Sequence, residues 1–142
     1  LVEIIQHYKK IKNNKILIIL SGKRRDFLIN ELDKLGINYL YKEMADLKTV
    51  NELYNILDLY IVSSRFEGGP QSVLECAITK TPIISTDVGL ASSVLSPSSI
   101  FNMNNYKLAE PDTDYARKRI EDFKLTKSMP RYLKMLEYAY ES

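Results

Sequence analysis

Residues 59–79 read LYIVSSRFEGGPQSVLECAIT, and this stretch decides the fold. It opens with an aliphatic run over residues 59–62, passes through two glycines and a proline, and continues with helix-like spacing over residues 71–79. The pattern predicts a buried strand, a tight turn and the start of a helix. A strand that leads directly into a helix is the repeating unit of parallel α/β folds.

The same alternation continues on both sides of this stretch. Upstream, the spacing of Val2, Ile5, Tyr8 and Ile11 predicts a helix, and a second helix ends before Gly36. The other predicted elements are strands over residues 15–21, 37–41, 58–63, 82–86 and 99–102 and a helix over residues 47–57. The aliphatic run inside residues 15–21 suits a strand that is buried on both faces. Together these elements predict an α/β fold, a Rossmann-like parallel sheet with helices on both faces.

The C-terminal segment has a different pattern. Residues 112–123 and 127–140 predict two helices, and Pro130 limits the second to starting near itself. The second helix carries an apolar stripe that needs a surface to cover it, formed by Tyr132, Leu133, Leu136 and Tyr140.

Composition restricts the class of protein. With 142 residues, 45% of them hydrophobic and 27% charged, the chain fits one domain over residues 1–142. A net charge of +2 gives no reason to expect a nucleic-acid partner. The single cysteine, Cys76, is expected in the core and suits a cytoplasmic protein. The first residues look like the interior of a helix, so we expect the chain to be a fragment of a longer protein.

The turn and the helix start carry the chemistry of the predicted site. A helix N-terminus presents unpaired N–H groups and a positive dipole, and it therefore attracts phosphate. Gly68 and Gly69 lack a Cβ, so a ligand can approach their backbone closely. Pro70 suits the first helical position, where its missing N–H costs nothing.

Two glutamates flank this turn. Glu67 precedes the glycines, and Glu75 lies on the helix face that also carries Gln71 and Ser72. A carboxylate repels phosphate but accepts hydrogen bonds from sugar hydroxyls. The combination predicts a site for a phosphorylated sugar or a nucleotide.

Three further loops are predicted at the same edge of the sheet, because each follows a strand: residues 22–24, 41–44 and 87–89. In open parallel sheets, ligands bind in the crevice beyond the carboxyl ends of the strands. The sequence has one histidine, His7, and no acidic cluster with the spacing of metal ligands, so no metal or cofactor is expected.

Two segments together resemble a known family. They are residues 64–77, SRFEGGPQSVLECA, and residues 81–89, TPIISTDVG, and they look like the C-terminal half of a retaining GT-B glycosyltransferase. The resemblance is to the glycosyl transferases group 1, family 4 in the sequence classification. It implies a donor-binding half of a GT-B fold, with a nucleotide diphosphate sugar such as a UDP- or GDP-sugar as donor. The N-terminal acceptor-binding domain of the same parent chain would be its partner.

The resemblance also implies roles for single residues. Glu67 would be the catalytic residue, contacting the transferred sugar or stabilising positive charge at the reaction centre. Glu75 would hold the ribose hydroxyls. The backbone amides of Gly68, Gly69, Gln71 and Ser72 would hold the sugar and the diphosphate. Gly22 would lie near the phosphates, and a loop that includes Lys42, Glu43 and Met44 would border the base.

One family feature has no counterpart in this chain. The family carries an Arg and a Lys near the start of this half, and Lys23 and Arg24 do not match their position. We therefore expect the chain alone to be inactive. The resemblance further implies a glycan, lipid-linked sugar or cell-surface polysaccharide as acceptor, and a cytoplasmic location with peripheral contact at the inner membrane face.

Two other functions stay open. One is a GT-B-like nucleotide-sugar epimerase, although the segment with two glutamates and two glycines fits a transferase better. The other is a non-catalytic flavodoxin-like or receiver-like interaction domain. A receiver needs an acidic pocket after its first strand, whereas here that strand ends in Ser21 and Gly22. A nicotinamide-binding Rossmann domain is disfavoured because no G-x-G-x-x-G follows the first strand.

Overall fold

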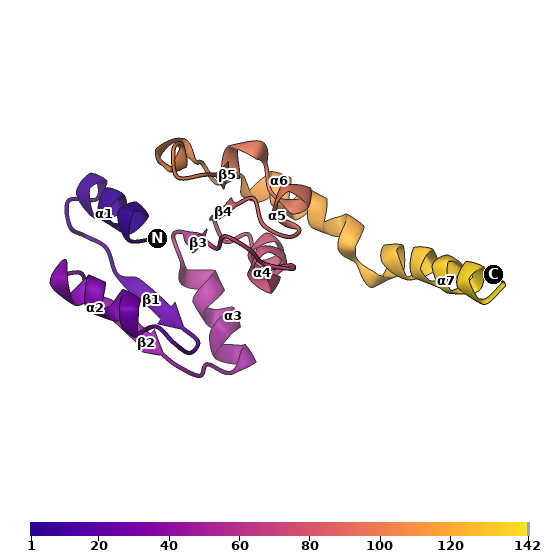
Figure 1. Cartoon of the computed structure of the whole chain (residues 1–142), viewed down its shortest axis with the longest axis horizontal. Helices are drawn as coiled ribbons and strands as arrows, with labels where there is room; N and C mark the ends of the chain where they lie inside the picture. Colours follow the sequence, from indigo (N-terminus) through magenta and orange to yellow (C-terminus); the bar gives the residue numbers. More distant parts are fainter. Residues whose placement is uncertain (142) are drawn as a thin grey trace. The chain divides into compact units, whose positions relative to one another are not determined.

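The structure, a computed structural model that describes residues 1–141, alternates strands and helices along the chain (Figure 1). It divides into a first compact unit, Leu1–Leu53, and a second unit that starts at Tyr54. In the described part of the chain every strand pairing is parallel, within one sheet of two strands and one of three. The predicted α/β class is confirmed, with helices flanking the parallel strands.

The first unit pairs two strands and packs helices against them. Its elements are α1 (Val2–Ile11), β1 (Ile18–Ser21), α2 (Asp26–Lys34) and β2 (Tyr39–Lys42). In the β1–β2 ladder Ile18 lies opposite Tyr39. One hydrophobic cluster joins these elements through Ile5, Leu20, Leu28, Leu32 and Ile37.

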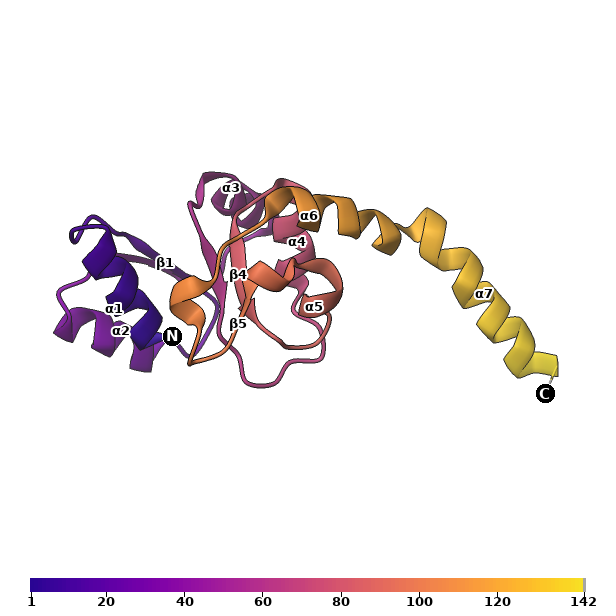
Figure 2. The ribbon, with the colours of Figure 1, turned by 90° about the horizontal axis from the view of Figure 1, so that it is seen from above.

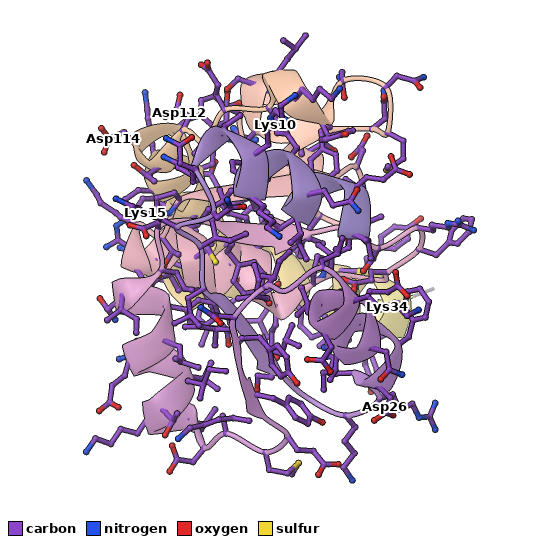
Figure 3. All side chains as sticks on the ribbon, turned by 90° about the vertical axis from the view of Figure 1, so that its left-hand side faces the viewer. Lys10, Lys15, Asp26, Lys34, Asp112 and Asp114 are labelled. Atoms are coloured by element: carbon purple, nitrogen blue, oxygen red, sulfur yellow. The ribbon has the colours of Figure 1, made fainter. Side chains whose placement is uncertain are left out.

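The charged residues of α2 and the glycine that follows it suit the two ends of this helix. Asp26 lies in its first turn and Lys34 in its last, where each complements the helix dipole (Figure 3). Gly36 follows with a φ of +58°, a backbone conformation that glycine adopts without strain. This helix therefore ends where the sequence predicts.

The next helix, α3 (Leu47–Ile56), contains the boundary between the two units. The backbone N–H of Thr49 donates to Asp46 Oδ1 at 2.7 Å, so the Asp46 carboxylate satisfies one of the unpaired donors at the start of α3. This bond lowers the pKa of Asp46 below its ordinary value. Near its C-terminal end, α3 buries the ring of Tyr54.

The second unit holds the three-stranded sheet (Figure 2). Its elements are β3 (Tyr60–Val62), α4 (Gln71–Thr79), β4 (Ile83–Thr86), α5 (Ala91–Val94), the 3₁₀ turn η1 (Pro97–Ser99), β5 (Ile100–Phe101), η2 (Tyr106–Leu108), α6 (Thr113–Arg119), η3 (Ile120–Phe123) and α7 (Leu125–Glu141). The strand order is β3-β4-β5, and α4, α5 and α6 pack against one another. Val73, Ile84 and Val94 are completely buried in this unit.

Two predictions about buried faces are wrong. Leu17, expected inside a strand buried on both faces, is 60% exposed and lies before β1 begins. Ile11, expected on the apolar stripe of α1, is 52% exposed, whereas Ile5 of the same stripe is buried as predicted, together with Ile4. Leu17 lies just before the paired segment of β1, and Ile11 is the last residue of α1, so both lie at the end of an element and outside the core.

The start of α7 also differs from the prediction. The helix begins at Leu125, and Pro130 lies inside it. A proline removes one i to i−4 hydrogen bond, and the other bonds of a 17-residue helix remain. The stripe of Tyr132, Leu133, Leu136 and Tyr140 is exposed.

Candidate functional site

The loop between β3 and α4 leads into an N-terminus that no side chain caps. The helix bounds, Gln71–Thr79, match the prediction. Pro70, however, is the residue before the helix rather than its first member, because its ψ of 112° is extended. Pro70 has no side-chain oxygen, so it leaves the N–H groups of Gln71 and Ser72 without a side-chain acceptor.

The loops that follow β3 and β4 are joined to each other. Thr86 Oγ1 donates to the carbonyl of Ser64 at 2.7 Å. Further along, Gly89 packs against the backbone of Gly68 and Gly69. Within the second unit, the carboxyl ends of the parallel strands therefore bring residues 63–70 and 87–89 together, as the sequence predicts.

Glu67 is held at the surface of this loop. Ser64 Oγ donates to Glu67 Oε1 at 2.6 Å, which orients one oxygen of the carboxylate. The side chain is exposed, as is the neighbouring Phe66. A ligand at the helix N-terminus could therefore reach Glu67 without displacing the core.

Glu75 lies about one turn into α4 and is partly buried. Its Oε2 accepts a hydrogen bond of 2.7 Å from the hydroxyl of Tyr54. Burial and this bond raise the pKa of Tyr54, so the phenol keeps its proton and acts as a donor. Sequence reasoning missed Tyr54 as part of the site, since its spacing marks it only as part of the apolar face of α3.

The remaining candidates belong to the first unit. Gly22 follows β1 with a φ of +89°, and Lys42, Glu43 and Met44 are exposed at and just after the end of β2. The Tyr41 hydroxyl donates to the carbonyl of Gly22 at 3.2 Å, which connects the two strand ends. The residues predicted for the site therefore fall into two groups. Gly22 and residues 42–44 belong to the first unit, and the residues from Glu67 to Glu75 belong to the second.

The basic residues near Gly22 are exposed. Arg24 has a φ of +61°, and Arg25 Nε donates to the carbonyl of Ser21 at 2.9 Å. Arg25 thus fixes the turn after β1, while Lys23 and Arg24 extend into solvent.

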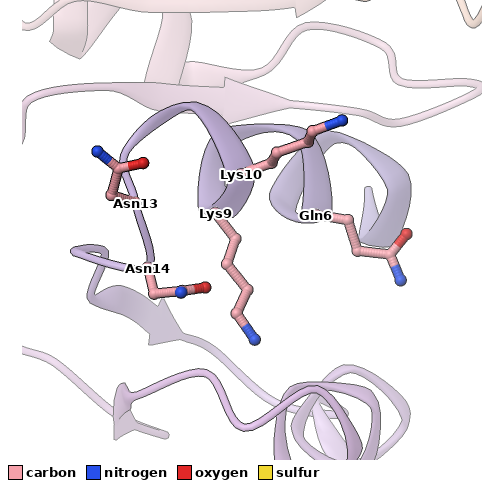
Figure 4. A pocket seen from close by; sticks show the side chains of 5 residues that line it. All are labelled: Gln6, Lys9, Lys10, Asn13 and Asn14. Carbon is pink, nitrogen blue, oxygen red and sulfur yellow. The ribbon is translucent and has the colours of Figure 1, made fainter.

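A pocket of the first unit is separate from these candidates. It lies at the C-terminal end of α1 and the turn that follows, and Figure 4 shows its lining: Gln6, Lys9, Lys10, Asn13 and Asn14. Lys9 Nζ donates to the carbonyl of Leu35. A second pocket, in the second unit, is lined by residues of α7 alone. Neither pocket contains a residue predicted for the site.

Residues 1–141 lack two features that would define other kinds of site. No three His, Cys, Asp or Glu side chains in that range are grouped so that they could hold a metal ion. No helix in the same range has the length and apolar character needed to cross a membrane. Cys76 is buried in α4, as expected from its neighbours.

Comparison with known proteins gives one family and one fold. A solved structure described as "Crystal structure of GtfA/B complex" matches with a TM-score of 0.67 and 14% identity, over 99% of this chain and 33% of the other. The chain thus spans about a third of the length of that relative, and the likeness shows the fold. No curated protein matches the chain. The family model described as "Glycosyl transferases group 1" matches residues 1–142, and the chain belongs to this family.

Proposed function

We propose that the chain is the donor-binding domain of a retaining glycosyltransferase of family 4, which transfers a sugar from a nucleotide diphosphate sugar to an acceptor. The observation that carries this proposal is the combination at α4. An uncapped helix N-terminus follows two glycines, and a carboxylate is held about one turn behind it. The first feature suits a diphosphate and the second suits the hydroxyls of a ribose.

The diphosphate would bind at the start of α4. The N–H groups of Gln71 and Ser72 point out of the helix N-terminus, and Pro70 offers them no competing acceptor. A Cβ built on Gly68 would meet no atom within 4 Å, so there is open space beside this backbone. Phosphate oxygens could accept from these amides at little cost in rearrangement.

The two carboxylates would have different roles. Glu75 would accept hydrogen bonds from the ribose, because it is partly buried and oriented by Tyr54. Glu67 would face the transferred sugar, since it is exposed in the loop before the helix and oriented by Ser64. Retaining transfer develops positive charge on the sugar ring and negative charge on the leaving phosphate. A carboxylate near the first charge and a helix N-terminus near the second would stabilise both.

The first unit carries the remaining residues that we propose to bind the donor. Gly22 would approach the phosphates, and Lys42, Glu43 and Met44 would border the base, because these residues lie at the carboxyl ends of β1 and β2. The domain that binds the acceptor would be a further part of the parent enzyme. We therefore expect the chain alone to bind donor nucleotide without transferring sugar.

Titration of the chain with nucleoside diphosphates tests this proposal. We expect UDP or GDP to bind, and the corresponding nucleoside, which lacks the diphosphate, to bind at least about tenfold more weakly. Equal affinity for the nucleoside and its diphosphate would contradict a diphosphate site at α4.

A further inference from the structure

We propose that Tyr54 is a positioning residue, which holds the Glu75 carboxylate in the orientation that receives a ribose hydroxyl. This inference rests on the proposed function, since it needs Glu75 to be the ribose contact. It assigns a role to a residue of α3, a helix that supplies none of the residues predicted for the site.

The contact has the geometry of a strong hydrogen bond. The Tyr54 hydroxyl lies 2.7 Å from Glu75 Oε2, and the two residues are 21 positions apart in the sequence. Hydrogen bonds from a hydroxyl to a carboxylate are about twice as strong as neutral ones. This bond fixes one oxygen of the partly buried carboxylate. The other oxygen, Oε1, would receive the ribose hydroxyl.

The aromatic ring of Tyr54 is a rigid support for this bond. Its side chain is 8% exposed, and its ring packs against that of Tyr60 with centroids 5.6 Å apart. A buried ring in a packed core keeps one rotamer. The position of the hydroxyl is therefore fixed by folding rather than by the ligand.

The backbone of Tyr54 is also bonded to the segment that follows α4. Thr81 is 3% exposed, and its Oγ1 donates to the carbonyl of Tyr54 at 2.7 Å. Thr79 Oγ1 lies 2.6 Å from Thr81 Oγ1. Thr79 Oγ1 also lies 2.8 Å from the carbonyl of Glu75, so its one proton is given either to Thr81 or to this carbonyl. Tyr54 is thus held through both its carbonyl and its hydroxyl by the segment that carries Glu75.

Fixing the carboxylate has a consequence for binding. An unrestrained glutamate side chain loses conformational entropy when it is ordered, and this loss opposes binding. With Tyr54 in place, part of this cost is met when the protein folds, so the ribose hydroxyl binds more tightly. Loss of the Tyr54 hydroxyl should therefore weaken the ribose contact specifically, and leave the diphosphate contact unchanged.

The test compares a nucleoside diphosphate that binds the chain with its 2′-deoxy and 3′-deoxy analogues. Calorimetry measures the affinity of each compound. The quantity compared between variants is the affinity for the ribose form divided by the affinity for the weaker-binding deoxy form. The variants are Tyr54→Phe, Glu75→Gln and the double substitution. Tyr115→Phe is the matched control, because it removes an exposed tyrosine hydroxyl from α6 in the same unit.

We expect a ratio of about 10 or more in the wild type, and a fall of at least about threefold in Tyr54→Phe with the affinity for pyrophosphate unchanged. Glu75→Gln should reduce the ratio further, and the double variant should equal Glu75→Gln, because Tyr54 acts through Glu75. Thr81→Val tests the same role without removing the phenol, because it removes the hydroxyl that donates to the carbonyl of Tyr54. We expect its affinity ratio to lie between those of the wild type and Tyr54→Phe.

The outcomes separate the two proposals. If Tyr54→Phe and Thr81→Val both keep the wild-type affinity ratio but melt at a lower temperature, the bond only stabilises the fold. That result would overturn the positioning role. A wild-type ratio in Glu75→Gln, or absence of nucleotide binding by the wild type, would instead overturn the proposed function, and the positioning role with it.

Discussion

Gly89 lies so close to Gly69 that a Cβ at position 89 would come within 2.8 Å of the Gly69 nitrogen. Gly89 also has a φ of +54°, in the left-handed region. The loop after β4 therefore supports the two glycines that precede α4. Its own glycine is required both by conformation and by contact.

Gly89→Ala should destabilise the second unit by about 2 kcal/mol or more, because a backbone atom must move and the φ becomes strained. Gly68→Ala is the matched control, since its Cβ would meet nothing within 4 Å. Urea unfolding of both variants measures the difference. If the two variants are equally stable, the backbone at Gly69 does not restrict the residue at position 89.

Asp46→Ala should lower the melting temperature at neutral pH, because Thr49 loses its acceptor at the start of α3. The hydrogen bond with Thr49 lowers the pKa of Asp46, so its stabilising effect is present above the ordinary pKa and is lost as pH falls through the lowered value. Asp46→Asn should keep the cap without this pH dependence. Melting curves at pH 7 and pH 3 compare the three proteins, and a pH-independent gap between wild type and Asp46→Ala would contradict the account.

Cys76 should be unreactive in the folded protein. It is completely buried, and burial raises the pKa of its thiol to about 12, so that only about 1 thiol in 10,000 is ionised at pH 8. Labelling with a thiol reagent should proceed only as fast as the protein opens, and become rapid in urea. Fast labelling without denaturant would mean that α4 is not packed as described.

Glu67→Ala, made in a full-length enzyme that carries this domain, should lower kcat by about 100-fold or more while nucleotide affinity stays within about twofold. Ser64→Ala should give a smaller loss in kcat, because it removes only the bond that orients Glu67. Steady-state transfer assays measure both variants. Wild-type turnover in Glu67→Ala would remove this residue from the reaction.

The bounds of α4 could be predicted from sequence because its signals are local. Two glycines and a proline precede the helix, and Lys80 ends it in the left-handed conformation. Strands are less well marked at their ends, since aliphatic residues continue beyond the paired segment. Leu17 shows this, as an exposed residue next to β1.

The partner of Glu75 could not be predicted in the same way. Spacing marks Tyr54 as part of an apolar helix face, and its ring is indeed buried. The direction of its hydroxyl depends on the tertiary contact of Tyr54 with Glu75, a residue far from it in the chain. At Pro130 a local signal was misleading. The proline predicted that the helix starts near it, but α7 begins at Leu125 and continues through Pro130.

Calorimetric titration of the chain with UDP, GDP and ADP tests the central claim most directly, with Glu75→Ala beside the wild type. Glu110→Ala is the matched control, as an exposed glutamate of the same unit between η2 and α6. The account predicts that UDP or GDP binds selectively, that Glu75→Ala weakens this binding about tenfold or more, and that Glu110→Ala has no effect. Nucleotide binding that is unchanged in Glu75→Ala would contradict the donor site at α4.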